Sequence, residues 1–213
     1  MSEFSLDGYR ELLEAAKAGG YRFTSLGEAP QAGDLFLRHD VDLSLAAALR
    51  MAEVAAELGV RSTWFLMTRS VFYNLRSQEG ADVIARLRAC GGWIAHHAVW
   101  PHLDLDESFG FEPVVAWHNP EPEYMNEPIE LAVNVMSAPW FDPDHYRSDS
   151  NQNWRHGSPR EALARGEFEW LQLLVHPEIW VYDGETMGET MRSFLDEDRQ
   201  LRLEHLRADR IDL

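Results

Sequence analysis

A short charged run at the end of an apolar stretch constrains this chain more than any other feature. The run Arg38-His39-Asp40-Val41-Asp42 follows Leu35-Phe36-Leu37 and leads directly into a segment rich in Ala and Leu. Alternate side chains of a strand share a face, so Asp40 and Asp42 are expected to project together where a strand ends. In open α/β sheets and in β/α barrels, active sites are built at that end of the strands.

Two neighbouring carboxylates repel each other unless a cation or a shared proton relieves the repulsion. The spacing of Asp40 and Asp42 therefore indicates a functional pair. The alternative is local and structural. In that interpretation the run forms an Asx turn, and Asp42 caps the helix that follows.

Strand-like and helix-like segments alternate along the chain. Strands are expected at residues 35–41, 60–67, 93–97, 114–118, 129–135 and 170–175, and helices at 6–17, 43–58, 81–90 and 184–207. Successive strand–helix–strand units form parallel sheets with right-handed crossovers, so we expect one α/β domain over residues 1–213. The stretch 137–158, rich in Asp, Asn, Pro and Trp, is expected to be an ordered loop with a function.

Charge and composition limit the partners. The net charge of −17 argues against nucleic acid and anionic membranes, which need Lys and Arg to neutralise their phosphates. Cys90 is the only cysteine, which excludes an internal disulfide and a thiolate zinc cluster. No apolar run approaches the roughly 20 residues needed to span a bilayer, and the N-terminus does not resemble a secretory signal. A cytoplasmic protein is the expectation.

Histidines recur at the ends of the expected strands. They are His39, His96, His97, His118 and His176. These ends converge in space in a β/α fold. Imidazoles and carboxylates without thiolate suit Zn²⁺, Fe²⁺, Mn²⁺, Co²⁺ or Ni²⁺ with a position left open for water.

The pair His97 and His102 is the most ligand-like, because two imidazoles across a tight turn can hold one ion. His96 is the alternative to His97 as the first ligand of the pair. Adjacent strand residues point to opposite faces, so only one of the two can be a ligand. His176 follows a separate strand and has no ligand partner near it in sequence. It fits a general acid better than a ligand.

Several segments together resemble one family, the polysaccharide deacetylases of the NodB-homology superfamily, and more narrowly its WbmS-like branch. The resemblance runs in order from about residue 35 to residue 180. Its motifs are Arg38-His39-Asp40-Val41-Asp42, Ser62-Thr63-Trp64-Phe65, Trp117-His118-Asn119-Pro120, Tyr146-Arg147-Ser148-Asp149-Ser150 with Trp154, and Leu171-Gln172-Leu173-Leu174-Val175-His176-Pro177 with Trp180.

This resemblance implies a distorted β/α barrel of about seven strands. It also implies a metal-dependent hydrolase of amide groups, most often a sugar N-deacetylase of surface-polysaccharide metabolism, with zinc as the first choice of ion. Carried over residue by residue, Asp40 is the general base and His176 the general acid. The metal ligands would be Asp42, His97 and His102. The residues lining the substrate groove would be His118, Asp149 and Trp154.

The chain departs from the family pattern at three points. The segment between His102 and Val114 is short, so that one element of the barrel is expected to be missing. His97 and His102 are five residues apart where the family has four, and Asn119 follows His118 where the branch has Arg. Two alternatives to a sugar deacetylase therefore stay open. One is a carbohydrate-binding relative without catalysis, and the other is a hydrolase of a small non-sugar amide.

Overall fold

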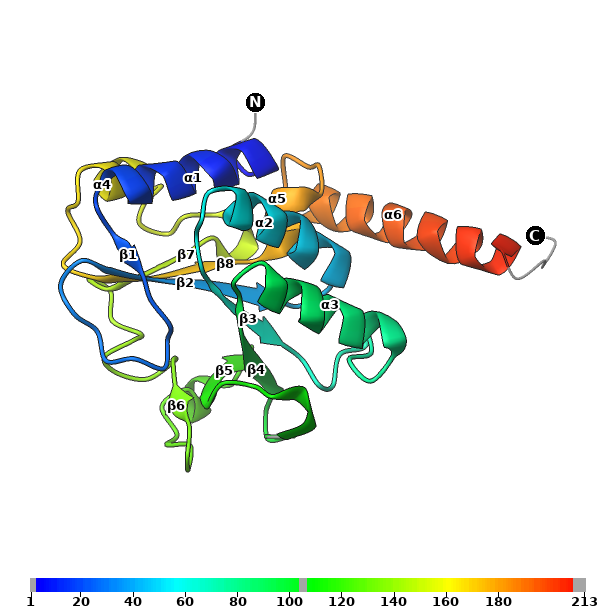
Figure 1. The fold of residues 1–213 in the computed structure, drawn as a ribbon, viewed down its shortest axis with the longest axis horizontal. Coiled ribbons are helices and arrows are strands. Elements are labelled where there is room, and N and C mark those ends of the chain that lie inside the picture. Colours follow the sequence, from blue (N-terminus) through cyan, green and yellow to red (C-terminus); the bar gives the residue numbers. More distant parts are fainter. Residues whose placement is uncertain (1–2, 104–106, 209–213) are drawn as a thin grey trace.

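The computed structural model describes residues 3–103 and 107–208, and its centre is one parallel β-sheet (Figure 1). The strands lie in the order β6-β5-β4-β3-β2-β8-β7, with β1 pairing alongside β2. Every pairing between these strands is parallel. Their bounds are β1 Arg22–Phe23, β2 Asp34–Val41, β3 Thr63–Leu66, β4 Trp93–Val99, β5 Val114–His118, β6 Val133–Asn134, β7 Tyr146–Ser148 and β8 Leu171–Val175.

The sheet curls into a half-barrel within a single α/β domain, which confirms the expected distorted β/α barrel. The α-helices are α1 Leu6–Ala18, α2 Leu45–Glu57, α3 Gln78–Ala89, α4 Arg160–Ala164, α5 Pro177–Val181 and α6 Met187–Ala208. Short 3-10 helices lie at Glu107–Phe109, Pro122–Tyr124 and Ser150–Gln152. Helices α1, α2 and α3 lie side by side across the outer face of the sheet (Figure 1).

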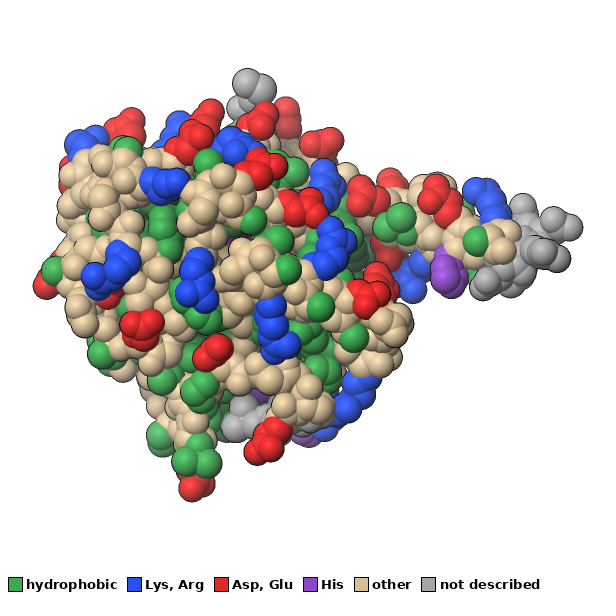
Figure 2. Space-filling view, in the orientation of Figure 1, with side chains coloured by type: hydrophobic (Ala, Val, Ile, Leu, Met, Phe, Trp, Pro, Cys, Tyr) green, Lys and Arg blue, Asp and Glu red, His purple; other side chains and the backbone are tan. Residues whose placement is uncertain are grey.

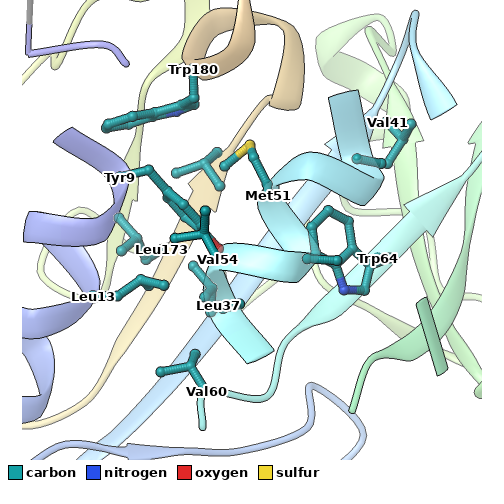
Figure 3. Packing of buried hydrophobic residues seen from close by; sticks show 14 of the residues in the cluster. Tyr9, Leu13, Leu37, Val41, Met51, Val54, Val60, Trp64, Leu173 and Trp180 are labelled. Carbon is teal, nitrogen blue, oxygen red and sulfur yellow. The ribbon is translucent and has the colours of Figure 1, made fainter. Parts of the chain in front are cut away.

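Alternation along β2 separates two environments. Leu35, Leu37 and Val41 face the helices and join the main core, where Leu37 lies beside Val54 (Figure 3). Phe36 points the other way, into a second apolar cluster inside the curled sheet. Because every second side chain of a strand points to the same face, the next inward positions after Phe36 are 38, 40 and 42. The interior therefore changes from apolar to charged toward the carboxyl ends of the strands.

Serine, and not Asp42, caps helix α2. Ser44 is the N-cap residue, and its Oγ accepts a hydrogen bond from the Ala47 N–H at 3.1 Å. The local alternative for Asp42, a helix cap, is therefore wrong, and the Asp42 carboxylate is left for other contacts.

The late, irregular part of the chain differs most from expectation. The strand expected at residues 129–135 is only Val133–Asn134, and the expected loop 137–158 contains β7, which pairs with β8. Helices α4 and α5 lie where the sequence pattern predicts no helix. These elements have two to five residues each, too few to show a hydrophobic period.

Acidic and basic side chains are interspersed over the helix-covered face, and α6 extends beyond the rest of the molecule (Figure 2). Among the described helices, none has both the length and the apolar character required to cross a bilayer.

Candidate metal centre

A cavity of about 500 Å³ opens at the carboxyl ends of the strands. Its wall includes Asp40 from β2, Asp42 just beyond β2, His97 from β4, His118 from β5 and His176 just after β8. Four separate segments thus bring these side chains to one place, as the convergence of parallel strands predicts.

Three donor atoms in this cavity form a nearly equilateral triangle. His97 Nε2 lies 3.0 Å from Asp42 Oδ1, and His118 Nδ1 lies 3.2 Å from each of these two atoms. Donors that share one ion at about 2.0–2.2 Å are separated by about 3 to 3.5 Å, so the triangle is close in size to one ion's ligand set. Among the described residues, Asp42, His97 and His118 are the group that meets the geometric requirement for a metal site.

A backbone carbonyl fixes the orientation of the His97 ring. His97 Nδ1 lies 3.1 Å from the carbonyl oxygen of Ala116 on the neighbouring strand. A carbonyl can only accept, so Nδ1 carries the proton, and in the neutral ring the lone pair of Nε2 faces Asp42. Metal-binding histidines usually have this second contact. Two acceptor atoms 3.0 Å apart need a proton or a metal ion between them.

His96 points away from the group, as alternation along a strand predicts. Its Nε2 lies 3.3 Å from Thr68 Oγ1, and its ring stacks on Phe111 at 5.7 Å between centroids. Of these two histidines, His97 is the one that faces Asp42 and His118.

The structure does not bring His102 together with Asp42 and His97, with which it was expected to form a ligand set. Its backbone N–H donates to Val99 O in a tight turn after β4, and its side chain is exposed. His118, expected only to line the substrate groove, supplies the third donor atom of the triangle. The signal for this was available: β5 pairs with β4 so that His97 is opposite Ala116, and His118 is two residues further on the same face.

The electrostatics of the group favour a bound cation. Burial raises the pKa of the Asp42 carboxyl, but its contacts with the imidazoles of His118 and His97 together outweigh burial and hold that pKa well below its usual range. The hydrogen bond with Asp42 raises the pKa of His118, against the effect of burial. Asp42 is therefore ionised and available as a ligand across the neutral pH range.

Arg38 holds Asp40 in place. The guanidinium donates from Nε and Nη2 to the two carboxylate oxygens of Asp40, at 2.7 and 2.5 Å. Burial raises the pKa of Asp40, but the charges of Arg38 and His97 and the hydrogen bonds from Arg38 together outweigh burial, and the net shift of the pKa is downward. Asp40 Oδ2 lies 3.7 Å from His97 Nε2, beside the triangle. Alternation along β2 could have found this pair, since residues 38 and 40 share a face.

His176 is held by a buried carboxylate. Its Nδ1 lies 2.6 Å from Asp149 Oδ1, and its backbone N–H donates to Asp149 Oδ2 at 2.9 Å. Trp180 Nε1 donates to the same Oδ2 at 2.6 Å. Burial lowers the pKa of His176, but the adjacent carboxylate outweighs burial and raises the pKa to about 10.

Asp149 therefore lies behind His176 and does not line the cavity, contrary to the expected groove position. It is completely buried. Sequence alone could not find this contact, because it depends on β7 pairing with β8. Trp154 does line the cavity, while its ring packs near Phe4 and Trp180.

No family model, curated protein or solved structure matches this chain. The donor set and the groups around it are therefore what indicates a function. Two imidazole nitrogens and one carboxylate oxygen, without thiolate, form the kind of open three-ligand set in which an ion keeps a free position.

Proposed function

We propose that the protein is a metal-dependent hydrolase of C–N amide bonds, and that its reaction is the N-deacetylation of a sugar. One observation carries the proposal: the triangle of Asp42, His97 and His118 shares its cavity with Asp40 and His176. The motif resemblance to NodB-type deacetylases supports the same reaction. Action in the cytoplasm remains an expectation from the sequence.

The ion expected at the triangle is divalent, and zinc suits its donor set best. When bound, such an ion supplies Lewis-acid chemistry, polarising the acyl oxygen and acidifying a water molecule. The protein's own part is to hold three ligand atoms in place before any ion arrives.

Asp40 accepts the proton of the attacking water. It is ionised, fixed by two hydrogen bonds to Arg38, and placed beside the ligand triangle. Arg38 acts here as a positioning residue.

His176 protonates the nitrogen that leaves. Its raised pKa keeps the ring protonated at neutral pH, and its contact with Asp149 fixes Nδ1 so that Nε2 is the donor. A base and an acid with separate environments are what amide hydrolysis requires.

Aromatic side chains support a sugar as the substrate. Trp117, Phe141, Tyr146 and Trp154 all line the cavity. Rings of this kind present flat apolar faces with polar edges, which suit the mixed character of a sugar.

The test is release of acetate from N-acetylglucosamine oligomers by the zinc-loaded protein. We expect Asp40→Asn and His176→Gln each to lower kcat by about 10²- to 10⁴-fold. Asp144→Asn, an exposed carboxylate that does not line the cavity, is the matched control and keeps full activity.

The outcomes separate the alternatives. Sugar binding by calorimetry with no acetate release contradicts the hydrolase proposal and favours a binding protein. Hydrolysis of small amides such as formamides, without hydrolysis of N-acetyl sugars, keeps the reaction but contradicts the substrate.

A further inference from the structure

The cavity wall carries basic side chains in a protein that is strongly acidic as a whole. The net charge is −17, yet Arg147, Arg155 and His156 all line the cavity. They come from one stretch, β7 and the loop that follows it. A local concentration of basic groups against the overall charge indicates selection for a negative ligand.

The acidic groups of the cavity do not neutralise these bases. Asp40 is paired with Arg38, and Asp42 belongs to the ligand triangle. Asp142 is the remaining carboxylate on the wall, and its Oδ1 accepts from the backbone N–H of Asp144.

Arg155 and His156 are the bases left without partners. Within residues 3–103 and 107–208, neither side chain has an ion pair or a hydrogen bond, and both are exposed. Arg147 differs, since its Nη1 donates to the carbonyl oxygens of Pro143 and Tyr146 at 2.6 and 2.7 Å.

The segment that carries the two bases is anchored on its N-terminal side. The Gly157 N–H donates to Trp154 O at 3.0 Å, so Arg155 and His156 are the central residues of a four-residue turn. Trp154 is buried at one end of this turn. Just before it, Gln152 Nε2 donates to Gly184 O at 2.9 Å. These contacts hold the turn in place, so that Arg155 and His156 lie at the cavity.

We propose that Arg155 and His156 bind an anionic group, a carboxylate or a phosphate, carried by the substrate. Arg suits both anions because its planar guanidinium can donate two parallel hydrogen bonds. That the anion belongs to the substrate rests on the proposed function. Binding of an anion by the turn does not.

The experiment compares three sugars that differ in charge: N-acetylglucosamine, its 1-phosphate and the corresponding 6-carboxylate. Binding is measured by calorimetry on the chelator-treated wild type, where turnover does not interfere, and KM and kcat are measured on the zinc-loaded wild type. We expect at least one anionic sugar to bind about tenfold more tightly than the neutral one. The sugar that binds more tightly shows whether the anionic group is a phosphate or a carboxylate.

The double variant Arg155→Gln/His156→Gln should remove this preference by raising KM for the anionic sugar, with kcat retained. Arg199→Gln is the matched control, an exposed arginine on α6 away from the cavity, and it should keep the preference. Equal binding of the three sugars, no binding of any of them, or a preference that survives in the double variant overturns the inference.

The two proposals fail in different ways. Anion-selective binding that depends on the turn, without hydrolysis, supports the anion site and contradicts the hydrolase. Hydrolysis without selection by charge supports the hydrolase and contradicts the anion site.

Discussion

His118 and His102 are rival third ligands beside Asp42 and His97. The structure places only His118 within 3.2 Å of both partners, while His102 is exposed in a turn. Losing even an outer partner of a ligand costs about 10- to 100-fold in metal affinity, so we expect His118→Ala to weaken zinc binding by about 100-fold or more. His102→Ala is the matched control and should keep the wild-type affinity. Calorimetry of the chelator-treated proteins measures both, and the reverse order would contradict the site.

Asp149 sets the pH range over which His176 can act as an acid. A raised pKa of about 10 means that the ring keeps its proton well above neutral pH, and activity should fall only as pH approaches that value. In Asp149→Asn the opposing effect of burial remains while the attraction is gone. The alkaline limb of the pH–rate profile should therefore move to lower pH by about one unit or more. A limb that stays in place would show that His176 is not the acid.

His39 makes the fold sensitive to acid. Its ring stacks on Trp64 at 3.8 Å and its Nε2 lies 2.8 Å from the Tyr9 hydroxyl. Burial lowers its pKa to about 3. The unfolded chain, with a pKa near 6.5, therefore binds the proton first, so stability is complete above about pH 6.5 and falls as pH drops toward 3.

The test uses His39→Gln, which keeps a polar partner for Tyr9 but removes the titration. The stability advantage of the wild type should shrink by about 1 kcal/mol for each pH unit below pH 6. Denaturant unfolding with a chelator present measures this without a contribution from metal release. Parallel pH curves for the two proteins would contradict it.

The N-terminus of helix α2 is capped by a residue other than Asp42, which leaves the Asp42 carboxylate free for the ligand triangle. Ser44 caps the helix, and its Oγ also lies 2.8 Å from the Tyr182 hydroxyl. Ser44→Ala should lower the free energy of unfolding by about 1 kcal/mol, the usual cost of a lost cap. Ser193→Ala, within α6 and away from a cap, is the control and should have little effect. An equal effect of the two variants in denaturant unfolding would contradict the assignment.

Elements with a clear apolar pattern were predictable from the sequence, and the short elements of the irregular region were not. Strand β5 has the expected bounds, Val114–His118, and α1 ends one residue beyond expectation. Three-residue β7 is defined by its pairing with β8, at Tyr146 opposite Gln172. Contacts of this long range leave no local pattern, which is why Asp149 was assigned to the groove and not to His176.

The parallel sheet explains why some side chains of the candidate metal centre were predictable from the sequence and others were not. Alternation placed Asp40 and Asp42 on one face and separated His97 from His96, because these are properties of single strands. The third ligand depends on which strands are neighbours. A nearby histidine in sequence, His102, was therefore a poorer guide than His118 on the adjacent strand β5.

The number of divalent ions held by the triangle is the most direct test of this account. Chelator-treated protein should bind one zinc ion per chain in a calorimetric titration, with the ratio confirmed by elemental analysis after dialysis. Asp42→Asn should bind none at that site, while Asp144→Asn should bind one, as the wild type does. Wild-type protein without a stoichiometric ion, or Asp42→Asn with undiminished zinc, would contradict the central claim.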